Sequence, residues 1–214
     1  MDSAEHSKVT KRHTGRDRVE AGIVAAAVRI FAECGYEGTS VAAIADAAGL
    51  SKQNLMYYFP TKQALYERVL DDVLDDWLAR MESLANADGE PAEVLRAYVR
   101  AKLRFSREQP AASRVYAMEV IGGAKIYGEQ MKRRVVPLLR RDIEMFETWK
   151  SQGRIAAAID STHLLFALWA LTQQYADFSA QMALVLGRAE LTDDDFERAE
   201  RLITHMVTRT IAVD

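Results

Sequence analysis

The stretch from Lys52 to Tyr57 carries polar side chains suited to reading the edges of DNA bases. The amide groups of Gln53 and Asn54 can each pair bidentately with adenine, and the ring of Tyr57 can contact a thymine methyl group. Lys52 adds a positive charge suited to a phosphate. Such chemistry requires these side chains to stand together on one exposed surface, for example near the N-terminal end of a helix.

Residues 39–60 predict two short helices joined by a tight turn, which would position the polar stretch. The first helix has a buried face at helical spacing, formed by Val41, Ile44, Ala45 and Ala48. Gly49 follows, where a positive φ would end that helix, and Ser51 can cap the second. With Leu55 as an apolar anchor, the pattern fits a helix-turn-helix. An ordinary helical hairpin in a structural bundle is the alternative.

A second polar set could bind a small molecule. Steps of four place Trp169, Gln173 and Asp177 in one sector of a predicted helix, and a polar pair on an inward face needs partners. In one interpretation, Lys102, Arg114 or the backbone satisfies the pair. In the other, a small planar ligand with amide groups does so: Gln173 can pair with an imide edge, Asp177 can accept a ring N–H, and Trp169 or Trp77 can stack on the flat face. Pyrimidines have these groups, and so do other small planar amides, including purines.

The same predicted helix, from Asp160 or Ser161 to Leu186, has another apolar side. Its residues recur at steps of three and four, as a seam between two helices requires. They are Leu164, Leu168, Leu171, Tyr175, Phe178, Met182 and Val185. This seam is a candidate for pairing with a second copy of the chain.

No group of residues indicates catalysis, a metal site or a cofactor. The histidines show no metal-ligand spacing, and neither a nucleophile motif nor a Gly-rich phosphate loop is present. The acidic couples at residues 71–72 and 75–76 lie on a helix surface without His or Cys nearby, which favours a solvated face. We therefore expect a protein that is not an enzyme and needs no cofactor.

Helical periodicity throughout, with nothing that reads convincingly as a strand, predicts an all-α protein of about nine helices. We expect an N-terminal three-helix head with the helix-turn-helix and a larger C-terminal helical body for ligand binding and dimerisation. A long helix from Lys62 to about Asn86 joins them. The expected parts are a flexible basic arm over 1–16, a DNA-binding domain over 17–62, and an effector-binding and dimerisation domain over 63–214.

Composition limits the partners. The 214 residues are 49% hydrophobic with a formal net charge of −3, which allows a large core and argues against general polyanion binding. A basic run near the N-terminus could contact phosphates beside a helix-turn-helix: Lys8, Lys11, Arg12, Arg16 and Arg18. The single Cys34 excludes an intrachain disulfide. No membrane-length apolar run or signal peptide is evident, so we expect a cytoplasmic protein without a membrane partner.

Residues 35–40, 44–49 and 51–62 together resemble the signature of TetR-type transcriptional regulators. That signature is a helix-turn-helix, then Tyr-Tyr-Phe, then a Lys at the start of the next helix, and it covers roughly the first third of the chain. The resemblance implies a homodimer bound to a double-stranded DNA operator. It implies base contacts by Gln53, Asn54 and Tyr57 and phosphate contacts by Thr39, Lys52, Tyr58 and Lys62. For Tyr58, the alternative is a ring in the core with only its hydroxyl reaching outward.

Residues 169–178 and 109–114, with Met118 and Glu119, resemble the pyrimidine-responsive repressors of that family, whose effector is uracil or thymine. This implies a repressor of nucleobase metabolism genes that its effector releases from the operator. We expect the effector to lie beside Trp77, Met118, Trp169, Gln173 and Asp177. In the family the last two helices form the dimer interface, which matches the seam above. The alternatives are a regulator of the same fold with another small planar or hydrophobic effector, and a helical adaptor without a DNA role.

Overall fold

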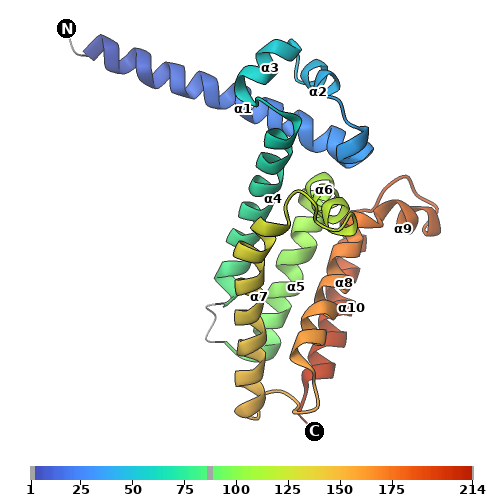
Figure 1. Ribbon diagram of the computed structural model, residues 1–214. Coiled ribbons are helices and arrows are strands. Elements are labelled where there is room, and N and C mark those ends of the chain that lie inside the picture. The colour runs from blue at the N-terminus through green and yellow to red at the C-terminus, as the bar shows by residue number, and fades with distance from the viewer. Residues whose placement is uncertain (1–2, 86–88, 214) are drawn as a thin grey trace. The chain divides into compact units, whose positions relative to one another are not determined.

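A computed structural model describes the backbone of residues 3–85 and 89–213 and the side chains of residues 15–79 and 89–213. Over this part of the chain all regular structure is helical, which confirms the predicted all-α class (Figure 1). Ten helices stand where about nine were predicted. The chain divides into two compact units, Met1–Asp72 and Val73–Asp214. No described helix is long and apolar enough to cross a membrane.

The first unit contains α1 (Ser3–Gly38), α2 (Val41–Ala47), α3 (Lys52–Tyr58) and the first turns of α4 (Lys62–Ala85). Gly35 has φ 68° and interrupts the helical geometry of α1. The small core of this unit includes Ile23, Phe31, Ile44 and Leu55. The predicted flexible arm over 1–16 stays a prediction, because the side chains of residues 1–14 lie outside the described residues.

The boundary between the units lies later than the predicted one at residues 62–63. Leu65, Tyr66, Val69 and Leu70 of α4 are all buried in the first unit. The opening turns of α4 therefore complete the core of the helix-turn-helix unit, because they add four buried apolar side chains to it. The division falls after Asp72.

The second unit contains the rest of α4 and the helices α5 (Pro91–Glu108), α6 (Pro110–Ile121), α7 (Gly128–Ser151), α8 (Ser161–Asp177), α9 (Ser179–Val185) and α10 (Asp193–Ile211). Helix α8 is central, since it packs against α5, α6, α7 and α10 (Figure 1). The core of the second unit includes Tyr98, Leu165, Leu168 and Ile203. The α8 face that meets these neighbours is the one on which a ligand would be enclosed.

The predicted helix from residue 160 or 161 to 186 is divided in two at Phe178 (Figure 1). Phe178 has φ −112° and ψ 19°, and the Ser179 hydroxyl donates to the Ala176 carbonyl at 3.0 Å. Such local side-chain bonds compete with the helical ladder, so the chain changes direction without a Gly or Pro. This break accounts for the tenth helix.

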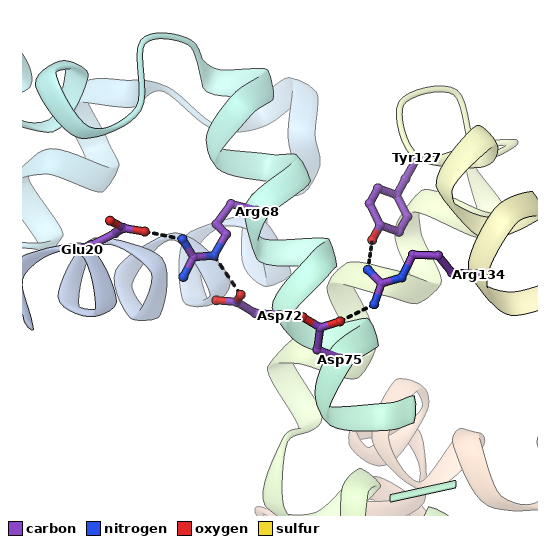
Figure 2. Close-up of polar contacts among 6 residues, drawn as sticks. All are labelled: Glu20, Arg68, Asp72, Asp75, Tyr127 and Arg134. Atoms are coloured by element: carbon purple, nitrogen blue, oxygen red, sulfur yellow. Dashed lines mark hydrogen bonds and ion pairs between the residues drawn. The ribbon is translucent and has the colours of Figure 1, made fainter. Parts of the chain in front are cut away.

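Two acidic residues of α4 are paired with arginines (Figure 2). In the first unit, Arg68 donates to Asp72 at 2.8 Å and also pairs with Glu20 of α1. In the second unit, Asp75 pairs with Arg134 of α7, whose guanidinium lies 3.5 Å from the Tyr127 hydroxyl. The sequence predicted a solvated face for these couples, and the arginine partners of Asp72 and Asp75 were not part of that prediction.

Candidate functional site

The helix-turn-helix presents the predicted polar residues together on α3. Gly49 has φ 69°, and the Ser51 hydroxyl accepts the Asn54 N–H at 3.1 Å, which fixes the start of the helix. Leu55 anchors the opposite side in the core. The exposed side chains are those of Lys52, Gln53 and Asn54 in the first turn and of Tyr57 one turn later, with Tyr57 71% exposed. This arrangement is suited to insertion of a helix end into a major groove.

Arg16, which was not among the predicted base or phosphate contacts, lies beside the rings of Tyr57 and Tyr58. Tyr57 and Tyr58 meet edge to face, with centroids 5.4 Å apart, and Tyr58 is half-buried. The guanidinium of Arg16, from α1, lies 5.9 Å from the centroid of each ring. The sequence placed Arg16 only in a basic run, because its distance to α3 depends on how α1 packs.

Thr39 and Lys62, predicted to contact phosphates, are instead held within the first unit. Thr39 is only 4% exposed, and its hydroxyl donates to the Gly35 carbonyl at 2.6 Å. We therefore correct its assignment, since a buried hydroxyl does not reach a phosphate. The Lys62 ammonium donates to the carbonyls of Tyr36 and Thr39 at 2.7 and 3.0 Å. These two bonds tie Lys62 to the turn between α1 and α2 and use two of the three N–H groups of its ammonium. A phosphate contact would therefore use only the third N–H.

The second unit contains a cavity of about 60 Å³ walled by five helices. Three of the five predicted ligand residues line it: Trp77 from α4, and Trp169 and Gln173 from α8. The remaining lining residues are Val73, Leu74, Lys102, Phe105, Ser106, Ser113, Tyr116 and Val135. Four aromatic rings and a few polar groups in an otherwise apolar wall are typical of a site for a small molecule.

Asp177 and Met118, also predicted at the ligand, do not line the cavity. Asp177 lies behind the wall, where it accepts the Ser113 hydroxyl at 3.0 Å and an N–H of the Gln173 amide. Burial raises the pKa of Asp177, and these two hydrogen bonds oppose that shift. Asp177 thus orients two lining residues. Met118 lies two residues beyond Tyr116. Because an α-helix has about 3.6 residues per turn, two residues correspond to more than half a turn, so Met118 lies on another side of α6.

Lys102 and Tyr98 contribute to this site in ways that the sequence analysis did not identify. Lys102 is 5% exposed, and its ammonium lies 5.1 Å from the centroid of the Trp77 ring. Burial lowers its pKa to about 8, and the charge of Asp177 opposes that shift. The Trp169 indole N–H donates to the Tyr98 hydroxyl at 3.0 Å, which holds the ring that faces the cavity. A detectable signal existed for Lys102: it continues the buried α5 stripe at the spacing of Leu95, Tyr98 and Val99.

An apolar groove of about 680 Å³ lies along α8, α9 and α10. Its wall includes four of the seven predicted seam residues, namely Tyr175, Phe178, Met182 and Val185. Leu202 of α10 adds a further apolar side chain, and Phe178 and Leu202 are 56% and 58% exposed. An exposed apolar surface of this kind marks an interaction site.

Leu164 and Leu168 are corrections to the predicted dimer seam. Both are buried in the core cluster of their own chain, so a partner has no surface of theirs to cover. Leu171 also packs against that cluster and is half-buried. In the first part of α8, the steps of three and four therefore reflect packing on neighbouring helices of the same chain. The seam residues that line the open groove are those from Tyr175 onward.

Two family models match the chain in succession. One, described as "Bacterial regulatory proteins, tetR family", matches residues 23–69, and the other, "YcdC-like protein, C-terminal region", matches residues 70–214. The chain is 38% identical over 198 residues to the HTH-type transcriptional regulator RutR of Escherichia coli (strain K12), covering 90% of this chain and 92% of that protein.

Solved structures show the same fold at low sequence identity. The ketosteroid transcriptional regulator KstR2 of Mycobacterium tuberculosis has a TM-score of 0.77 at 17% identity, over 91% of this chain and 95% of that one. AibR in complex with isovaleryl coenzyme A and operator DNA has a TM-score of 0.70 at 22% identity, over 88% and 97% of the two chains.

Proposed function

The chain belongs to the TetR family of bacterial regulatory proteins, which makes it a DNA-binding transcriptional regulator, and we propose that uracil or thymine is the effector that controls it. In this proposal the protein is a homodimeric repressor of nucleobase metabolism genes. It binds its operator through α3 of both protomers and leaves the operator when the effector occupies the cavity. A DNA partner places this activity in the cytoplasm.

The size of the cavity favours a single small ring. A volume of about 60 Å³ has room for about four water molecules. A pyrimidine base displaces roughly that amount of water, whereas a steroid or an acyl coenzyme A is far larger. The apolar residues and the two tryptophans can cover the faces of a flat ring, and the wall also has a few polar side chains, among them Gln173, Ser113 and Lys102.

The observation that carries the proposal is the fixed orientation of Gln173. One N–H of its amide donates to Asp177, which is itself held by Ser113. The amide therefore keeps a carbonyl acceptor and a second N–H donor for a ligand. An imide edge, with a ring N–H beside a carbonyl, complements this pair. Both segments that resemble the pyrimidine-responsive repressors contribute here, since Trp169 and Gln173 lie in one and Ser113 in the other.

The switch follows from the continuity of α4. One helix, Lys62–Ala85, supplies buried residues to the DNA-binding unit and Trp77 to the cavity wall. A ligand against Trp77 can favour one position of α4, and in a dimer this changes the spacing of the two α3 helices. Only a suitable spacing lets both enter the major groove together. A coupling of about 1–3 kcal/mol, roughly 5–150-fold in DNA affinity, is normal for such systems.

We expect uracil and thymine to release the protein from DNA of its own upstream region. The measurement is fluorescence anisotropy of labelled DNA at fixed salt, titrated with uracil, thymine, and 1,3-dimethyluracil as a matched ring without N–H groups. Release by the first two alone is the expected result, because only they can donate to the Gln173 carbonyl. Salt-sensitive DNA binding that no nucleobase alters would leave a DNA-binding regulator with another effector, and an absence of DNA binding would contradict the regulator itself.

The α3 residues are expected to divide into two classes of DNA contact. Gln53→Ala and Asn54→Ala should relax the preference for particular bases, at about 1–3 kcal/mol for each lost bidentate pair. Lys52→Ala should weaken binding to all sequences and reduce the salt slope by about one charge. The check is anisotropy on an operator and on scrambled DNA over a range of salt. A changed base preference in the Lys52 variant with an unchanged salt slope would reverse these assignments.

A further inference from the structure

The ammonium of Lys102 is buried at the proposed effector cavity and has no hydrogen-bond partner among the described residues. Its side chain belongs to the cavity wall and is 5% exposed. Among the residues that the structure describes, it makes no hydrogen bond or salt bridge, and its ammonium lies over the Trp77 ring, 5.1 Å from the ring centroid. Asp177, the nearest acidic influence, is bonded to Ser113 and Gln173 and acts on Lys102 only through its charge.

Such a lysine is costly to the empty protein. A buried ammonium carries three N–H donors, and leaving them unsatisfied in an apolar wall opposes folding. Burial lowers the pKa of Lys102 to about 8, so the group keeps its proton at neutral pH but holds it weakly. The Trp77 face offsets part of this cost. A hydrogen-bond acceptor that enters the cavity would offset much of the rest.

We propose that Lys102 anchors the effector by donating hydrogen bonds to one of its carbonyl oxygens. This inference rests on the effector function proposed for the cavity. Gln173, with one N–H committed to Asp177, offers its carbonyl to a ring N–H of the same ligand. Together, Lys102 and Gln173 select a planar cyclic imide or lactam, in which an N–H donor and a carbonyl acceptor are fixed in one ring.

The protonation of Lys102 then makes effector binding depend on pH. The anchoring form is the ammonium, and its fraction falls as pH rises through about 8. Between pH 7 and pH 9 this predicts about a tenfold loss of affinity. Other ionisable groups near the cavity are Asp177 of α8 and Tyr116 and Arg114 of α6, while Trp77 of α4 and Val135 of α7 do not ionise. Burial raises the pKa of Tyr116, which keeps it neutral in this range.

The test is calorimetry of the full-length protein with uracil as the probe, from pH 7 to pH 9. Lys102→Met keeps an extended apolar side chain and removes the donors. It should lower uracil affinity by about 10–100-fold, the value of a hydrogen bond to a charged group, and flatten the pH profile. Arg104→Met is the matched control, because it removes an exposed cation from the same helix. It should retain both the affinity and the pH dependence of the wild type.

Thermal unfolding without ligand provides a second measurement. Lys102→Met should unfold at a temperature no lower than wild type at pH 7, because it removes an unsatisfied buried charge. Uracil binding by Lys102→Met at wild-type affinity, or a flat pH profile in wild type, would overturn the anchoring role and leave the effector proposal intact. An absence of uracil and thymine binding by wild type would overturn the effector proposal, and the anchoring role with it.

Discussion

Gln173→Leu is expected to leave DNA binding in place and to abolish the response to uracil or thymine. Leucine has a similar volume, so the wall between Trp77 and Trp169 keeps its shape, while the amide that pairs with the imide edge is lost. The ligand would then leave its polar groups in an apolar environment, at a cost of about 1–3 kcal/mol for each unsatisfied group. Affinity for uracil should fall about 100-fold when an acceptor and a donor are lost together.

Two measurements check this expectation: calorimetry with uracil, and anisotropy of labelled operator DNA with and without uracil. Gln152→Leu makes the same exchange at an exposed position after α7 and should respond like wild type. Uracil binding that survives in Gln173→Leu would make Gln173 a core residue whose only role is to satisfy Asp177. A loss of DNA binding in the absence of uracil would indicate that the substitution disturbs the fold.

Phe178→Glu is expected to convert the protein to monomers that no longer hold the operator. Phe178 borders the groove along α8, α9 and α10, beside Leu202 and Met182. In a two-fold symmetric dimer each interface residue occurs twice, so two carboxylates would be buried without partners. Each costs several kcal/mol, which is enough to weaken the dimer by more than about a thousandfold. Each monomer then meets only one half-site, so operator affinity falls as well.

Size-exclusion chromatography with light scattering gives the mass, and anisotropy gives operator affinity. Val136→Glu is the matched control, because Val136 is an exposed apolar residue on α7, outside the groove. It should remain dimeric and bind DNA. A folded dimer formed by Phe178→Glu would place the interface on another surface of the second unit, and the groove would then need a different occupant.

Local signals made the DNA-binding unit predictable. The Ser51 cap needs an N–H only three residues away, and the positive φ of Gly49 is a property of one residue. The exposed side of α3 follows from Leu55 alone, because a helix that buries one side presents the opposite one. The roles of Thr39 and Lys62 did not follow in this way. Lys62 bonds to Tyr36, a residue 26 positions away, and only the packing of α4 brings them together.

The sequence showed the apolar pattern of α8, but it did not show which of these apolar residues lie in the core and which lie at the surface. Leucines at steps of three and four suit a partner chain and the chain's own core equally well, and the structure buries Leu164 and Leu168 internally. The break at Phe178 has no Gly or Pro to announce it. The chain breaks where the Ser179 hydroxyl donates to the Ala176 carbonyl, a bond that the apolar pattern does not reveal.

The candidate effector site shows most clearly which features the sequence determined and which depended on the tertiary structure. The sequence by itself determined which residue types were present, and the spacing that puts Trp169 and Gln173 on one sector of a helix. Only the tertiary structure decided that Gln173 lines a cavity while Asp177 stands behind it, 64 positions from the Ser113 that it holds. Only the tertiary structure, too, placed Lys102 in the same wall, where its ammonium has no hydrogen-bond partner within the described part of the chain. Helical periodicity specifies the direction of a side chain from its own axis, whereas the group it meets depends on how separate helices pack.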